Sequence, residues 1–365
     1  KDDAKNARAK ASAAIDEHLQ WLKEMLDRPN RSYAMGKKRL AKLLKLRGID
    51  LTPAEVLALG EKYLREFKEE KARVAESIAP GKGVDGAASI VRSRRPRTFE
   101  EALRATEHQM NQARMFISDA NVATVDPNAI LKVIETPAFL APLMPFAAMY
   151  MPAKFDRTQE GVYIVTRPKG DESLGERLNY AAIINTALHE AYPGHFHQGV
   201  MTNKKPIMLQ LAGFGGDVEY LACATETVEG WAHYCEKMMF DHGYEATDEA
   251  AFEMYTGAIW RACRIIADVK LAQGEASIEE ATEMMATETG MPRDAMEDEV
   301  KRYSHMPGQA LSYMLGRHLI LELRADLERR LGPRFNEKAF HDTVATYGFM
   351  PFHLVKETVL SELKA

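Results

Sequence analysis

The chain has 365 residues, of which 46% are hydrophobic and 28% are charged. This length and balance allow a large buried core, and they exclude an intrinsically disordered chain, a collagen-like chain and a small disulfide scaffold. The formal net charge of −5 implies no broad basic surface, so we expect no nucleic acid as a partner.

The apolar runs and the cysteines bear on the cellular compartment. The longest apolar run, residues 138–151, is shorter than the roughly 20 residues of a membrane span and contains two prolines, so we expect a buried, kinked core segment and no membrane span. The three cysteines, Cys223, Cys235 and Cys263, are too few and too uneven in number for a disulfide framework. Because no signal peptide is recognisable at the start either, the sequence predicts a cytoplasmic protein.

The first third of the chain is strongly charged and shows helical periodicity. Apolar residues at helical spacing predict helices over residues 4–27, 33–46 and 99–119. A further helix is expected from Thr52 to about Ile78, because Thr52 can cap it, Pro53 suits its first position and Glu55 completes a capping box. The glycines and the proline of residues 79–86 predict a loop.

The middle of the chain changes in character. Prolines are frequent between residues 122 and 168, and the β-branched and aromatic run Gly161–Thr166 predicts a strand. From Leu174 onward the chain is expected to be nearly all helix. The sequence therefore predicts a mainly α fold with a small β-sheet, in which residues 1–121 form a helical N-terminal lobe and residues 122–365 continue it within one domain.

A His-Glu pair closes an apolar helix at His189 and Glu190. A neutral imidazole can bind Zn²⁺, and a glutamate about 100° around the helix can take a proton from a metal-bound water. In the common zinc motif a second histidine follows four residues later, but that position is Pro193. The Pro-Gly pair permits a broken turn that could bring His195 beside His189, while His197 stays open as a competing ligand.

A catalytic zinc site needs a third protein ligand, and a second helix supplies candidates. We choose Glu229 as this ligand. Glu226 lies one helical turn before it and His233 one turn after it, where either side chain could hold a ligand in place. Gly230 allows a close approach between two helices, which suits such a site.

A third group of polar residues follows Pro307-Gly308. Gln309, Tyr313 and Arg317 recur every four residues, so they are expected on one face of a helix that starts there. The Tyr313 phenol could donate to an oxyanion, or it could be a buried hydroxyl with its own partner. Arg317 could bind a substrate carboxylate, or it could pair with Glu322.

The sequence resembles a bacterial family catalogued as domain of unknown function 885. The resemblance rests on three segments in order: His189-Glu-Ala-Tyr-Pro-Gly-His195, Glu229-Gly-Trp231 and Pro307-Gly-Gln-Ala-Leu-Ser-Tyr313. It departs from the family pattern at Phe196, where a second histidine is usual. Family members are regarded as zinc-dependent metallopeptidases, and they typically extend further upstream, which implies that this chain is short at its N-terminus.

The resemblance implies a zinc peptidase acting on short peptides, as a carboxypeptidase or an oligopeptidase. Residues 122–365 would be its catalytic region, with zinc on His189, His195 and Glu229, Glu190 as the general base and Tyr313 as the oxyanion donor. The strand Gly161–Thr166 would then form the edge of the sheet, to which a peptide substrate could add.

Two other functions and several accessory residues stay open. The same site could hydrolyse a non-peptide amide, or the chain could be a catalytically inactive helical binding protein. Gln309, Arg317, His233 and His305 are assigned to substrate contact or to support of the ligands, with packing as the alternative for the two histidines. The chain could also form a homo-oligomer, whose size the sequence does not determine.

Overall fold

A computed structural model describes residues 2–26, 32–141, 147–168, 170, 173–205 and 225–365. It is mainly helical with one small sheet, which confirms the predicted fold class. The helices are α1 (Asp2–Leu26), α2 (Lys37–Leu46), α3 (Pro53–Ile78), α4 (Gly83–Ser93), α5 (Phe99–Asp119), α6 (Leu174–Arg177), α7 (Tyr180–Glu190), α8 (His195–Asn203), α11 (Thr225–Asp241), α12 (Asp248–Gln273), α13 (Ile278–Thr289), α14 (Arg293–His305), α15 (Ser312–Leu331), the short η2 (Gly332–Arg334), α16 (Glu337–Tyr347) and α17 (Phe352–Glu362). The strands are β1 (Ile130–Glu135), β2 (Ala147–Tyr150) and β3 (Glu160–Val165).

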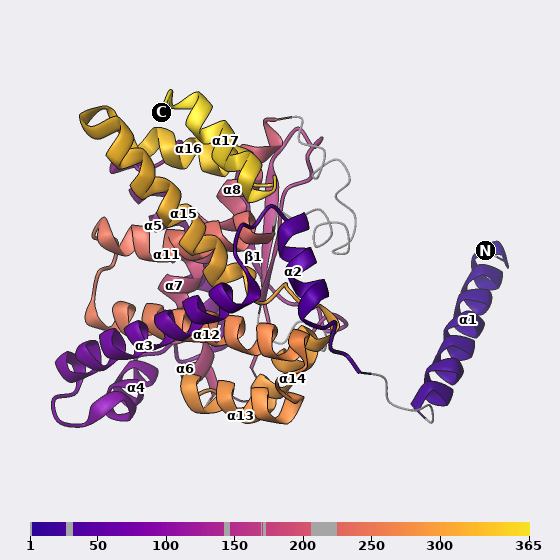
Figure 1. The fold of residues 1–365 in the computed structure, drawn as a ribbon. Helices are drawn as coiled ribbons and strands as arrows, with labels where there is room; N and C mark the ends of the chain where they lie inside the picture. Colours follow the sequence, from indigo (N-terminus) through magenta and orange to yellow (C-terminus); the bar gives the residue numbers. More distant parts are fainter. Residues whose placement is uncertain (1, 27–31, 142–146, 169, 171–172, 206–224) are drawn as a thin grey trace.

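The N-terminal helices follow the local signals of the sequence, except that the helix predicted from residue 33 begins only at Lys37. The capping box of Thr52 and Glu55 is present at the start of α3, with Pro53 in the first turn. The predicted loop 79–86 is too long, because α4 already begins at Gly83. Every described side chain of α1 is exposed, and this helix stands apart from the other elements (Figure 1).

Helix α3 lies against α12, and this contact joins the N-terminal helices to the C-terminal half (Figure 1). The two helices come close at Gly60, where a Cβ would lie 2.7 Å from the side chain of Ile265. Around this contact a core of apolar side chains includes Leu40, Leu44 and Met314. The boundary at residue 121 stays a prediction.

The sheet has the order β1-β3-β2, with β3 parallel to β1 and antiparallel to β2. The expectation that Gly161–Thr166 forms the sheet edge is therefore wrong, because β3 is paired on both sides. Part of the buried core segment expected over residues 138–151 is also wrong, since Phe139 is largely exposed and residues 147–150 form strand β2. Residues 142–146 of this segment lie outside the described residues. A Cβ at Gly161 would lie 2.5 Å from the ring of Phe196, so the sheet packs directly on α8.

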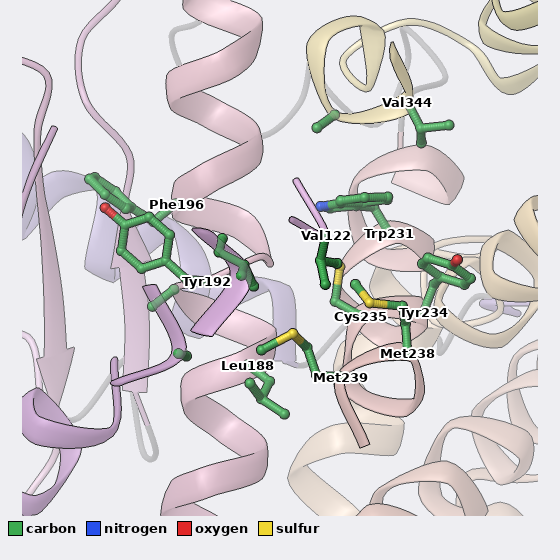
Figure 2. Close-up of a cluster of buried hydrophobic side chains, with 14 of the residues drawn as sticks. Val122, Leu188, Tyr192, Phe196, Trp231, Tyr234, Cys235, Met238, Met239 and Val344 are labelled. Atoms are coloured by element: carbon green, nitrogen blue, oxygen red, sulfur yellow. The ribbon is translucent and has the colours of Figure 1, made fainter. Parts of the chain in front are cut away.

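The largest apolar core lies between the sheet, the α7–α8 pair and α11. Leu188, Tyr192 and Phe196 belong to the α7–α8 segment, and Trp231 and Met239 come from α11 (Figure 2). Cys235 and Cys263 are buried, whereas Cys223 lies outside the described residues. None of the described helices is long and apolar enough to cross a membrane.

Candidate metal centre

A sharp corner between α7 and α8 brings two histidines together. Helix α7 ends at Glu190, the Tyr192–Pro193 peptide bond is cis, and α8 begins at His195. A Cβ at Gly194 would lie 1.8 Å from the carbonyl oxygen of His189, so only glycine fits this corner. The Trp231 indole donates to the Pro193 carbonyl at 2.8 Å and ties the corner to α11.

Glu229 of α11 completes a cluster with the two histidines. Its Oε2 lies 3.3 Å from Nε2 of His195 and 3.7 Å from Nε2 of His189, and the imidazole rings are 4.8 Å apart and nearly perpendicular. Each residue offers one ligand atom, and the three atoms lie within 4.8 Å of one another. Ligands of a tetrahedral zinc, each bonded at ~2.0 Å, lie about 3.3 Å apart, so the cluster has suitable donors at nearly the required spacing.

The charge state of Glu229 suits a metal ligand. Burial opposes its ionisation, but the adjacent His195 and His189 outweigh burial and hold the pKa of Glu229 well below its usual range. Its Oε2 is buried, and within the described residues it has no well-aligned hydrogen bond. The cluster therefore contains an ionised carboxylate oxygen that a cation would satisfy.

Glu236 orients His189 and was not among the residues chosen from the sequence. Its Oε1 accepts a hydrogen bond from Nδ1 of His189 at 2.7 Å, which leaves Nε2 turned toward Glu229. Asn185 donates to the other carboxylate oxygen, and Arg261 pairs with the first. The spacing of Glu229, His233 and Glu236 along one helix face was a signal that could have identified it.

His233 and Arg317 lie behind Glu236. His233 is fully buried, with Nδ1 3.3 Å from Glu236, and burial lowers its pKa to about 3, so the imidazole is neutral. Arg317 donates to Nε2 of His233 at 3.3 Å and stacks near the ring of Phe67. Both residues therefore pack behind Glu236, and the burial of Arg317 argues against contact with a substrate.

Glu226 lies outside the cluster and belongs to a buried ion pair. Its carboxylate lies 2.5 Å from the guanidinium of Arg47, which follows α2, and the two side chains are only 1% and 3% exposed. Arg47 also donates to the carbonyl of Gly308 and to Ser312. Asp268 of α12 accepts from the backbone N–H of Gly308, so α2, α11 and α12 all hold the segment before Tyr313.

Helices α11 and α15 cross closely beside the cluster. A Cβ at Gly230 would lie 2.3 Å from the backbone of Gly316, and a Cβ at Gly316 would lie 1.9 Å from the carbonyl oxygen of Glu226. The crossing places Tyr313 near the cluster: burial, and then the Glu229 carboxylate, raises the pKa of the Tyr313 phenol. The phenol is therefore protonated at neutral pH and can donate a hydrogen bond.

Two further predicted site residues, Glu190 and Gln309, are not members of the cluster of His189, His195 and Glu229. Glu190 ends α7 half-exposed, and its charge adds to burial in raising the pKa of Tyr163 on β3. Gln309 precedes α15, which starts at Ser312, so the expected helix beginning after Gly308 is three residues too long at its start. Gln309 still hydrogen-bonds with Tyr313.

Two predicted histidines lie outside the cluster. His197 is buried with Nε2 2.9 Å from the carbonyl of Thr124 and Nδ1 3.3 Å from that of Pro193. Its ring is thus turned toward backbone oxygens, and of the two competing histidines only His195 lies beside His189 and Glu229. His305 is exposed at the end of α14.

Two solved structures share the fold. One is "the putative lipoprotein from Colwellia psychrerythraea", with a TM-score of 0.79 and 21% identity, covering 94% of this chain and 58% of that one. The other is "a putative lipoprotein of unknown function from Shewanella oneidensis", with a TM-score of 0.79 and 23% identity, covering 96% of this chain and 65% of that one. This chain spans less than two thirds of the length of either neighbour, and identities this low concern the fold alone.

The comparison overturns the predicted cytoplasmic location. Both neighbours are described as lipoproteins, a class anchored to or exported across a membrane, so the cytoplasmic expectation is wrong. That expectation relied in part on the scarcity of cysteines. A chain of this size, however, buries enough apolar surface to fold without disulfides in any compartment.

Two further comparisons concern the sequence and its family. The sequence matches none of the curated proteins with which it was compared. The family model described as "Bacterial protein of unknown function (DUF885)" matches residues 1–359, nearly the whole chain. The chain therefore belongs to the DUF885 family of bacterial proteins.

Proposed function

We propose that this protein is a zinc-dependent hydrolase that cleaves peptide bonds of short peptides. The observation that carries the proposal is the buried cluster of His189, His195 and Glu229, with Glu190 next in sequence to one ligand. Three protein ligands leave a fourth position for water or substrate, as in catalytic rather than structural zinc sites. Glu190 is not one of the three proposed ligands, so its carboxylate can act as a general base.

The chemistry divides among a few groups of the chain. A bound zinc ion supplies Lewis acidity and lowers the pKa of a coordinated water. Glu190 takes a proton from the attacking water and delivers it to the leaving amine. Tyr313 donates a hydrogen bond to the carbonyl oxygen as charge develops on it, and Gln309 holds the phenol in place. His189 is kept in the required tautomer by its hydrogen bond to Glu236.

The lipoprotein description of the two structural neighbours supports a location of this activity outside the cytoplasm.

The first test is the metal content of the wild type and of His195→Ala, both purified without added metal and analysed by elemental mass spectrometry. We expect about one zinc per wild-type chain and little in the variant. His197→Ala is the matched control, because His197 faces backbone carbonyls, and it should keep the metal. A wild-type protein that takes up no zinc even after reconstitution would refute the proposal.

The second test separates chemistry from metal binding. Glu190→Gln should keep its zinc and lose at least 100-fold in kcat on a panel of short peptides, because the amide cannot take the proton from water. N-acyl amino acids assayed beside the peptides test hydrolysis of a non-peptide amide by the same residues. Turnover at the wild-type rate in Glu190→Gln would remove this residue from the mechanism.

A further inference from the structure

Two arginines share one glutamate beside Tyr313. Arg264 of α12 donates to Glu299 at 2.8 Å, and Arg302 of α14 donates to the same carboxylate at 3.1 Å. Both guanidinium groups act on the pKa of the Tyr313 phenol, as does Glu229 from the metal cluster. Tyr313 therefore lies near both the metal cluster and this arginine pair, with the Arg264 guanidinium 4.4 Å from its ring centroid.

Arg264 is fixed in place and cannot turn toward a ligand. Its guanidinium lies between the rings of Trp260 and Tyr313, at 4.1 and 4.4 Å from their centroids. Its Nε donates to the Tyr303 hydroxyl at 2.9 Å, and only 5% of the residue is exposed. These contacts make Arg264 a rigid support that also contributes a positive charge.

Arg302 is the accessible member of the pair. Nη1 donates to Gln309 at 2.8 Å, Nη2 donates to Glu299, and 35% of its side chain remains exposed. Within the described parts of the chain, Glu299 is the one carboxylate at ion-pair distance from either arginine. Two guanidinium groups thus share one carboxylate, and Arg302 is the more exposed of the two.

We propose that Arg302 binds a carboxylate of the substrate next to the bond that is cleaved, and that this carboxylate is the C-terminus of the peptide. The inference rests on the proposed peptidase function and specifies its substrate. If Tyr313 meets the carbonyl oxygen of the scissile bond and the leaving group lies toward Arg302, this guanidinium can meet a carboxylate one or two residues beyond that bond. The anion that every short peptide carries at that distance is its terminal carboxylate, and a planar guanidinium binds a carboxylate with two parallel hydrogen bonds. The protein would then release one or two residues from the C-terminus.

The test compares matched peptides on the zinc-loaded protein. One peptide ends in a free carboxylate, the second ends in a carboxamide, and the third is a carboxamide whose last residue is Asp. We expect kcat/KM for the free acid to exceed that for the plain carboxamide by 10- to 100-fold, the size of a lost charge-assisted contact. Arg302→Gln should remove this preference, and Arg302→Lys should restore part of it.

The acid-to-amide ratio compares two substrates on the same variant. A partial loss of folded protein lowers both rates by the same factor and leaves the ratio unchanged. Arg293→Gln is the control, because Arg293 is an exposed arginine on the same helix that pairs with other glutamates. It should keep the wild-type ratio. Equal cleavage of acid and amide by the wild type would overturn the inference and leave the peptidase proposal standing. Cleavage of the Asp carboxamide as fast as the free acid would assign the anion to a side chain, and would overturn the C-terminal assignment.

A binding measurement keeps the inference testable without turnover. Calorimetry on the metal-free wild type, titrated with an N-acyl dipeptide acid and with its amide, should show tighter binding of the acid, and Arg302→Gln should abolish the difference. This result without hydrolysis of any peptide would refute the peptidase function and retain the carboxylate site. Equal binding of acid and amide would refute the site itself.

Discussion

The carboxylate of Glu236 accepts from Asn185 and lies within ion-pair distance of His189, His233 and Arg261. This network fixes the ring of a proposed zinc ligand from behind. We expect Glu236→Gln to weaken zinc affinity by about 10- to 100-fold, because the amide loses the charge that holds the His189 tautomer. Competition with a chelator of known affinity would measure it. Asp241→Asn, on the exposed end of the same helix, should leave the affinity unchanged, and an equal loss in both variants would contradict the assigned role.

We expect protonation of His189 to make zinc uptake at the proposed site depend on pH. Burial opposes a charge on this imidazole, but the Glu229 and Glu236 carboxylates outweigh burial and raise its pKa to about 9 in the metal-free protein. Below that pH the ring carries a proton that zinc must displace, so apparent zinc affinity should rise by about tenfold per pH unit between pH 6 and pH 9 and flatten above. Titration at several pH values, in buffers of different ionisation enthalpy, would show the proton release. An affinity independent of pH would contradict this account.

Elements defined by local signals could be predicted from the sequence. The capping box of Thr52 and Glu55 fixed the start of α3, and the periodicity of residues 99–119 matched α5 at both ends. The broken turn at Pro193 and Gly194 also followed from local chemistry, because one residue lacks a donor and the other tolerates close backbone approach. Such signals lie within a few residues of the feature that they determine.

Features that depend on distant parts of the chain could not be predicted in this way. Strand β3 is central because residues 147–150 pair with it, and an apolar, proline-broken run gave no sign of that pairing. The role of Glu236 depends on α7 lying beside α11, and the pairing of Glu226 with Arg47 joins residues 179 positions apart. Helical spacing places Glu236 on the same face as Glu229, but it does not show that α7 lies beside that face. Tertiary packing selects these partners.

The crossing of α11 and α15 leaves no room for a side chain at Gly316. A Cβ there would overlap the carbonyl oxygen of Glu226, which is backbone and cannot turn aside. We expect Gly316→Ala to lower the free energy of unfolding by about 2–3 kcal/mol or more and to weaken zinc binding as Glu229 shifts. Denaturant unfolding of the metal-free protein and a zinc titration would measure the two effects. Gly290→Ala, at an open left-handed position, should cost only about 1 kcal/mol, and a loss as large as at Gly316 would contradict the steric argument.

The ion pair of Arg47 and Glu226 joins the N-terminal helices to the helix that carries Glu229. We expect Arg47→Met to lower the free energy of unfolding by about 3–5 kcal/mol, because it leaves the Glu226 charge buried without a partner. The double variant Arg47→Met/Glu226→Gln should recover part of this loss, since no buried charge remains. Thermal or denaturant unfolding would measure both. Additive losses in the double variant would show that the pair does not interact energetically.

The corner between α7 and α8 divides the two histidines between separate helices. When two histidines lie four residues apart in one helix, their imidazoles lie side by side as soon as that helix forms. Here the separation of His189 and His195 depends on the turn at Gly194, and that turn is tied by Trp231 to a helix nearly 40 residues further along. At the proposed zinc site, capture of the ion would therefore follow tertiary folding and not precede it. If the cluster binds zinc, we expect a newly made or partly unfolded chain to leave the ion to its surroundings, and only the folded protein to compete for it.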